Sequence, residues 1–106
     1  MINGGMMSYK RKVAIIDFPY SDLINSKKRP VLVIGEKEND LIICAITSNP
    51  DIKGIPVNLE KGELPLKSTI KYWQIHTILK ERIRSTIGTV TEKCYKDTVK
   101  KINTLL

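Results

Sequence analysis

Short apolar segments separated by turn residues recur along most of this chain, and this pattern predicts a mainly β structure. Strands are expected over residues 12–17, 30–36, 41–47, 55–59, 68–77 and 82–89. A turn over 37–40 predicts that the strands on either side of it pair as a hairpin. Pro56 places its short strand at an edge of the sheet, because proline cannot donate a hydrogen bond to a ladder.

The period of the apolar positions changes near the C-terminus. Tyr95, Val99, Ile102 and Leu106 recur at helical spacing. Thr91 is the expected N-cap, and Glu92 follows it in the first turn, where a carboxylate favours the helix dipole. One amphipathic helix of about four turns is therefore predicted to pack on a small, strongly bent sheet, which we expect to form a barrel.

The length of 106 residues suits one domain. We expect this domain to span residues 11–106, and residues 1–10 to be an N-terminal tail that is in part disordered or a tag. No apolar run is long enough to cross a membrane and no signal peptide is evident, so we expect a cytoplasmic location. Cys44 and Cys94 lack CxxC spacing and neighbouring histidines, which favours two reduced, buried thiols over a zinc site.

The formal net charge of +7 is large for so small a domain and suggests a polyanionic partner. Nucleic acid is the first candidate, and an acidic protein segment is the second. The basic excess is also compatible with a Lys-rich proteome and no special partner.

The first candidate site is a group of basic residues, Lys27, Lys28 and Arg29, at the end of a polar loop over residues 18–29. Pro30 restricts Arg29 to extended backbone. A guanidinium anchored in this way can bind a phosphate through paired hydrogen bonds. A solvated basic loop without a ligand is the alternative interpretation.

The second candidate group is Thr47, Ser48 and Asn49, which end the strand over 41–47. Two hydroxyls and an amide can donate to phosphate oxygens or to base edges. The same residue types also form turns after strands without any ligand.

The third candidate group is Lys71, Trp73, Gln74, His76 and Thr77 in the long strand. His76 is the only histidine and is a candidate for general acid–base chemistry. Strict alternation would place Gln74 and His76 on one face, and Lys71 and Trp73 on the other. Tyr72 and Trp73 are candidates to stack an unpaired base, although core packing is the alternative for Trp73 and His76.

The sequence shows no phosphate-binding glycine loop, dinucleotide fingerprint, EF-hand or metal-ligand cluster, so we expect neither a cofactor nor a metal. RNA cleavage is compatible with this expectation, because the 2′-hydroxyl of RNA is a built-in nucleophile. The protein must align that hydroxyl with the phosphorus, move protons and stabilise charge on the phosphate oxygens. An arginine, a hydroxyl donor and one acid–base group are enough for this task.

The order of these motifs resembles the MazF/PemK family of toxins over roughly residues 11–106. The segments that carry the resemblance are Asp17-Phe18-Pro19, Lys28 to Ile34, Ala45-Ile46-Thr47-Ser48, Ser68, Gln74 to Ile78, Ile87-Gly88 and the terminal helix. The Arg-Pro strand followed by an apolar strand that ends in Thr-Ser is the most telling part.

This resemblance implies an SH3-like barrel of about five to seven strands with a C-terminal helix, acting as a homodimer. It also implies a sequence-selective endoribonuclease that cuts single-stranded messenger RNA, and an antitoxin whose acidic tail lies across the RNA groove. The family's catalytic Arg and Thr correspond to Arg29 and Thr47. Lys27, Lys28, Ser48, Asn49, Lys71 and Gln74 are the expected RNA-binding residues, with His76 as a candidate acid–base group.

Two segments depart from the family pattern. Many members have Asp-Gln-(Ile or Pro)-Arg-Thr where this chain has Trp73-Gln74-Ile75-His76-Thr77, so an acidic and a basic residue are replaced. The usual Gly-Asp before the first strand is also absent, and Arg11-Lys12 stand there. Either His76 moves a proton, or the reaction depends on Arg29 and Thr47, or activity is weak.

Two other functions therefore stay open. One is a catalytically silent module that keeps the barrel and binds RNA or an antitoxin peptide. The other is a general SH3-like RNA-binding module, which would bind RNA with a steep salt dependence and leave it intact.

Overall fold

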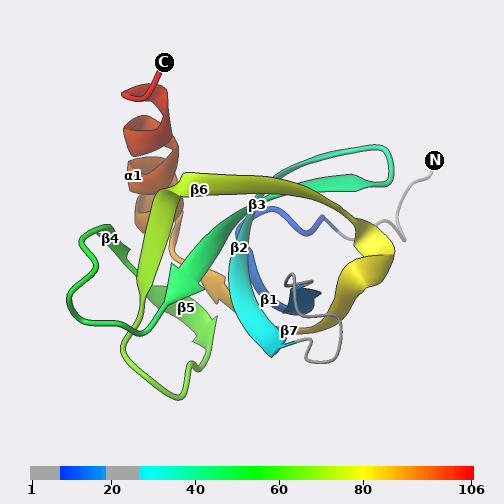
Figure 1. The fold of residues 1–106 in the computed structure, drawn as a ribbon, viewed down its shortest axis with the longest axis horizontal. Coiled ribbons are helices and arrows are strands. Elements are labelled where there is room, and N and C mark those ends of the chain that lie inside the picture. Colours follow the sequence, from blue (N-terminus) through cyan, green and yellow to red (C-terminus); the bar gives the residue numbers. More distant parts are fainter. Residues whose placement is uncertain (1–7, 19–26) are drawn as a thin grey trace.

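The computed structural model describes residues 8–18 and 27–106 of the chain. Its elements are β1 (Lys12–Phe18), β2 (Lys27–Lys37), β3 (Asp40–Thr47), β4 (Ile55–Pro56), β5 (Leu59–Gly62), β6 (Thr69–Leu79), the 3-10 turn η1 (Lys80–Arg82), β7 (Ile83–Val90) and α1 (Glu92–Asn103). The strands form one curled antiparallel sheet in the order β4-β6-β3-β2-β1-β7-β5 (Figure 1). The prediction of a mainly β, barrel-like fold with one C-terminal helix is confirmed.

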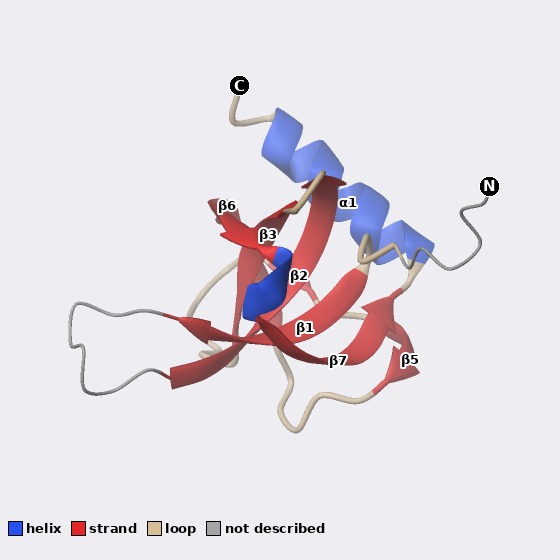
Figure 2. Ribbon diagram, turned by 90° about the vertical axis from the view of Figure 1, so that its right-hand side faces the viewer, coloured by secondary structure: helices blue, strands red, loops and turns tan. Residues whose placement is uncertain are grey.

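Apolar residues are buried on both faces of the sheet. Leu32 and Cys44 belong to one core cluster, whereas their neighbours Val31, Val33 and Ile43 belong to a second. Consecutive residues of a strand point to opposite faces, so the two clusters lie on opposite sides of the central strands. Helix α1 covers the first cluster and packs against β4 and β6. Figure 2 shows the helix lying along one side of the sheet.

Strand β2 begins earlier than the sequence predicts. Lys27 and Lys28, which were expected in the polar loop, lie in β2 and pair with Phe18 and Asp17 of β1. The pairing partner accounts for the difference, because β1 continues to Phe18 and supplies a ladder for three further residues of β2, residues 27–29. The rest of the expected loop, residues 19–26, lies outside the described residues, as does most of the expected N-terminal tail, residues 1–7.

A bulge interrupts the long strand β6. Ala45 pairs with Lys71, but the preceding residue of β3, Cys44, pairs with Ile75, so residues 72–74 have no opposite partner on β3. This bulge overturns the strict alternation predicted for the strand. Lys71 now lies on the same face as His76, because their β3 partners Ala45 and Ile43 share a face.

The expected strand over 55–59 is also corrected, because two shorter strands replace it. Strand β4 pairs with β6 at one edge of the sheet, and β5 pairs with β7 at the other. Pro56 lies in the edge strand β4, as predicted. Gly62 lies in β5 with φ of 82°, where an added Cβ would lie 2.0 Å from the Ile87 carbonyl oxygen.

Helix α1 starts as predicted. The Thr91 side chain accepts a hydrogen bond from the Cys94 N–H at 3.0 Å, which makes Thr91 the N-cap. The helix ends at Asn103, so the prediction that Leu106 continues its apolar face is wrong, and Leu106 is 98% exposed. Cys94 and Thr98 are the buried residues of the helix. No helix among the described residues is long and apolar enough to span a membrane.

Candidate functional site

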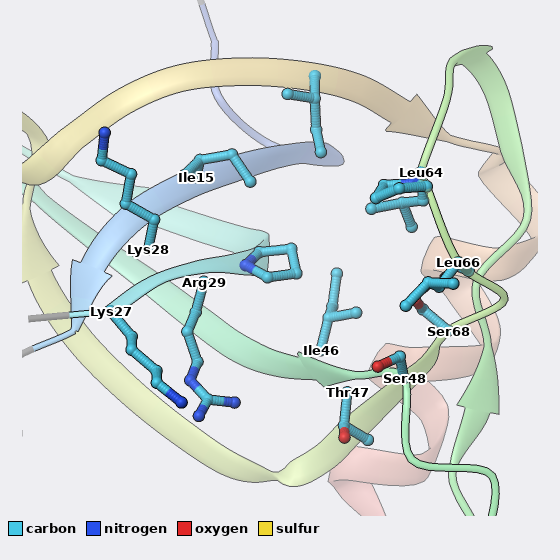
Figure 3. A pocket seen from close by; sticks show the side chains of 13 residues that line it. Ile15, Lys27, Lys28, Arg29, Ile46, Thr47, Ser48, Leu64, Leu66 and Ser68 are labelled. Carbon is cyan, nitrogen blue, oxygen red and sulfur yellow. Dashed lines mark hydrogen bonds between the residues drawn. The ribbon is translucent and has the colours of Figure 1, made fainter.

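Arg29 and Thr47 lie on one face of neighbouring strands. Val31 of β2 pairs with Ala45 of β3, and each of the two candidate residues is two positions beyond that pair on its own strand. Residues two apart on a strand share a face, so both side chains leave the sheet on the same side. Figure 3 shows the two side chains, with that of Lys27, projecting in the same direction, while Lys28 points the other way.

A polar hollow of about 260 Å³ opens beside this pair. Strand β6 supplies its far wall, where the bulge brings Lys71 onto the same side as Gln74 and His76. The complete lining is Arg29, Pro30, Ala45, Ile46, Thr47, Lys71, Gln74 and His76. Five of the predicted site residues, from three strands, therefore surround one space.

A second, more apolar hollow of about 450 Å³ lies on the other side of the same pair (Figure 3). Lys27, Lys28 and Ser48 line it together with Arg29 and Thr47, so these candidates also come together. Its apolar walls are formed by Ile15, Pro30, Ile46, Leu64, Pro65, Leu66 and Ile87, and Ser68 completes the lining. Arg29 and Thr47 thus separate a polar hollow from an apolar one.

The Thr47 hydroxyl is positioned by the turn that follows β3. Its Oγ1 accepts a hydrogen bond from the Asn49 N–H at 3.2 Å, and the Asn49 side chain accepts one from the Asp51 N–H at 2.9 Å. Accepting a bond leaves the hydroxyl proton available for donation to a ligand. Asn49 builds the turn and is not among the residues that line either hollow, unlike the other predicted RNA-binding residues.

The site is cationic. Lys27, Lys28, Arg29 and Lys71 contribute positive charge, and no carboxylate is among the described residues that line these two hollows. The Arg29 Nε is buried, so its guanidinium acts in a medium that screens charge less than bulk water does. Such an arrangement favours a phosphate over a cationic or neutral ligand.

The cysteine next to the site is not a nucleophile. Cys44 is buried in β3, and burial raises the pKa of its thiol to about 12. The thiolate is the reactive form of cysteine, so Cys44 stays protonated and inert at neutral pH. Its Sγ contacts the Tyr72 carbonyl oxygen at 3.8 Å, across the β6 bulge.

Residues 9–106 match the family model described as PemK-like, MazF-like toxin of type II toxin-antitoxin system. The chain belongs to this toxin family. Comparison with curated protein sequences gives no match. The match to the PemK/MazF model covers both hollows and all the strands that form them.

Solved structures of PemK/MazF toxins share this fold at low sequence identity. MazF in a MazE-MazF crystal structure from Deinococcus radiodurans superposes with a TM-score of 0.72 at 13% identity, covering 90% of this chain and 91% of that one. The Mycobacterium tuberculosis toxin MazF-mt6 gives 0.68 at 20% identity, covering 89% and 94%. An endoribonuclease from Mycobacterial species, solved with its cognate antitoxin, gives 0.60 at 21%, covering 90% and 86%.

The segment before β1, where this chain departs from the PemK/MazF pattern, adopts a glycine-like backbone. Arg11 has φ of 75°, in the left-handed region. Its Nη2 donates to the Val90 carbonyl oxygen at 2.9 Å and to Glu60 Oε1 at 2.7 Å. The arginine therefore adopts a backbone that glycine favours and makes side-chain contacts that a glycine could not make.

Several residues of the site were not found by the sequence analysis of this PemK/MazF chain. His76 also lines a third hollow of about 260 Å³, together with Asp17 and Arg82. Arg82 carries no local signal, since its place depends on the turn that joins β6 to β7. Leu66, which lines the apolar hollow, could have been found from the sequence, because it is an apolar residue between a proline and a lysine in a loop. It is 63% exposed.

Proposed function

We propose that this toxin is a metal-independent endoribonuclease that cuts single-stranded RNA at short preferred sequences. One observation carries the proposal: Arg29, Thr47 and His76, from three different strands, line a single cationic hollow. A guanidinium, a hydroxyl and an imidazole are enough to stabilise the phosphate and move a proton during cleavage by the RNA 2′-hydroxyl. The similarity to an endoribonuclease from Mycobacterial species supports the same activity.

Arg29 and Thr47 hold the scissile phosphate in this proposal. The Arg29 guanidinium donates to the non-bridging oxygens, whose negative charge increases in the transition state. The Thr47 hydroxyl, oriented by the Asn49 N–H, donates to one of the same oxygens. Both donors are fixed by paired strands, so little reorganisation is needed when the charge develops.

The reaction forms one bond and breaks another at phosphorus. The 2′-oxygen attacks the adjacent phosphate and loses its proton, the bond from phosphorus to the 5′-oxygen breaks, and that oxygen gains a proton. The products are a 2′,3′-cyclic phosphate and a 5′-hydroxyl end. His76 lies on the wall opposite Arg29 and moves one of these protons, the one to the leaving 5′-oxygen.

A pair of matched substrates tests this chemistry. A single-stranded RNA and the same strand with one 2′-deoxy nucleotide at the cut position are incubated with the antitoxin-free protein. We expect the RNA to be cut and the deoxy strand to resist at that position only, with a 5′-hydroxyl on the downstream product. Cutting of both strands at equal rates would contradict attack by the 2′-hydroxyl.

We infer that the natural inhibitor is an acidic antitoxin segment that covers the same groove. The apolar hollow can take an aliphatic or aromatic side chain, and Lys27 and Lys28 at its rim attract carboxylates. Relatives were solved as complexes with MazE or with a cognate antitoxin. Binding of the cognate acidic protein should exclude RNA, and simultaneous binding of both would contradict a shared groove.

We also propose that the toxin is a homodimer. Ile42, Ile75 and Leu79 are 37%, 39% and 45% exposed, and the register of β3 and β6 places them on one face. An apolar patch of this kind marks an interaction surface. Light scattering should give a dimer at micromolar concentration, and Ile75→Glu should shift it to a monomer, whereas a monomeric wild type would overturn the assignment.

One observation favours a second candidate, a module that binds RNA without cutting it. Strand β6 carries Trp73 and His76 where many family members have an acidic and a basic residue. An intact RNA bound with a steep salt dependence would identify this case.

A further inference from the structure

Trp73 is the only tryptophan of the chain and lies in the middle of the β6 bulge. Trp73 is 43% exposed, although Trp is highly buried on average, and the outer neighbour of β6, the short strand β4, pairs only with Thr69 and Ile70. Since residues 72–74 have no partner on β3, the bulge displays Trp73 at the surface instead of placing it in the core.

Two residues close to Trp73 in sequence belong to the candidate site. Lys71 and Gln74 both line the polar hollow, with Arg29 and Thr47 across from them. Lys71 faces Ala45, which is two residues before Thr47, so the backbone of Lys71 is offset from that of Thr47 by about 7 Å along the strand direction. Trp73 does not itself line the hollow, but it lies in the chain between two residues that do, close enough for its indole to meet a nucleotide that adjoins a phosphate held there.

The Trp73 ring is supported from one side. Tyr72 meets it edge-on, with ring centroids 5.0 Å apart and an interplanar angle of 89°. A perpendicular contact of this kind holds an aromatic ring in place, and Tyr72 can cover at most one of the two faces of the indole. Lys71 places a positive charge on the adjoining wall, which suits the backbone of a nucleic acid.

From these observations we propose that Trp73 is a stacking platform for one unpaired nucleobase of the RNA. The inference rests on the proposed function, because it takes RNA as the ligand of the hollow. Lys71 and Gln74, near Trp73 in sequence, line the cationic hollow and favour a nucleobase as the occupant, whereas the exposed Ile75, two residues on, is an apolar neighbour. A second copy of this chain covering Trp73 is the competing outcome.

Trp73 reports on its own contacts, because its fluorescence is the only tryptophan signal of the protein. The probe is a single-stranded 2′-O-methyl oligonucleotide, which cannot be cut because its 2′-oxygen is blocked. We expect its addition to quench the fluorescence. Trp73→Leu should weaken binding about 5- to 150-fold, whereas Trp73→Phe, which keeps an aromatic face, should retain most of the affinity.

An abasic scan separates stacking from a structural effect. One base of the probe is removed at each position in turn, and the affinities of wild type and Trp73→Leu are compared. We expect one position at which base removal weakens wild-type binding and adds no further loss in the variant. Equal losses in both proteins at every position would overturn the proposal, even if the variant folds poorly.

The two proposals fail in different ways. Quenching of the tryptophan fluorescence by the oligonucleotide, without cleavage of ordinary RNA, would support the stacking site and contradict the endoribonuclease activity. Cleavage of RNA with no change in tryptophan fluorescence on binding of the oligonucleotide would contradict the stacking site and leave the proposed activity unaffected. Fluorescence that depends on protein concentration and not on the oligonucleotide would assign Trp73 to the contact between two copies.

Discussion

Lys71 and His76 face β3 residues that are two apart, Ala45 and Ile43, although the bulge of β6 separates them in sequence. Between Lys71 and His76, β6 has three more residues than the facing segment of β3. The bulge that holds these extra residues brings Lys71, Gln74 and His76 together on one wall of the polar hollow. The bulge thus raises the density of functional groups opposite Arg29. It also moves Trp73 to the surface beside them.

Removing the Thr47 hydroxyl tests its role at the phosphate. Thr47→Val keeps the shape and β-branching of the side chain, and it should lower the cleavage rate about 100-fold, because one donor to the developing charge is lost. Thr47→Ser restores the hydroxyl and should recover most of the rate. Cleavage by the valine variant at the wild-type rate, measured with a defined oligonucleotide, would exclude the hydroxyl from the reaction.

The proton-transfer role of His76 can be separated from binding by changing the leaving group. His76→Gln should reduce cleavage of ordinary RNA about 100-fold or more, because the leaving 5′-oxygen needs a proton. A substrate with sulfur in place of that oxygen needs no proton to leave. The variant should cut this substrate nearly as fast as wild type does, and an undiminished defect would show that His76 does not protonate the leaving group.

Much of the fold follows from the apolar pattern of the sequence. β-branched runs identify β1, β2 and β3, and Thr91 identifies the start of α1, because these signals are local. The β6 bulge could not be predicted in this way. It arises from the register of two strands that are distant in sequence, and an alternation count over 68–77 contains no information about that register.

Part of the candidate site was predictable because its signals are also local. Arg29 and Thr47 were identified because each adjoins the end of a recognisable strand. Arg82 and Asp17 were not, since they reach the neighbourhood of His76 only through the turn at η1 and the end of β1. Leu106 was wrongly assigned to the helix face because apolar spacing alone does not show where a helix ends.

The left-handed backbone of Arg11 predicts a difference between two small substitutions. Arg11→Ala keeps the strained backbone and loses the bonds to Val90 and Glu60, so it should cost about 2 kcal/mol of unfolding free energy. Arg11→Gly loses the same bonds but relieves the strain, and it should be about 1 kcal/mol more stable than the alanine variant. Urea unfolding measures both, and an alanine variant as stable as the glycine variant would show that the turn is unstrained.

Cys44 predicts a loss of stability in alkali. Burial raises the pKa of its thiol to about 12, above the ordinary value of 9.0. The folded state therefore binds the thiol proton more tightly than the unfolded state does, so the stabilisation is complete below pH 9 and is lost as the pH rises from there towards 12. Urea midpoints of wild type and Cys44→Ala should converge over this range, and parallel pH profiles would contradict the burial of the thiol.

The most direct test of the central claim is cleavage of a long single-stranded RNA in EDTA by wild type and Arg29→Ala, with every cut end mapped. Lys100→Ala, which removes a positive charge from the exposed side of α1, is the matched control. We predict cuts at one short sequence by wild type and the control, and a rate about 100- to 1000-fold lower for Arg29→Ala. Intact RNA after incubation with the folded wild type, or equal cutting by Arg29→Ala, would contradict the account.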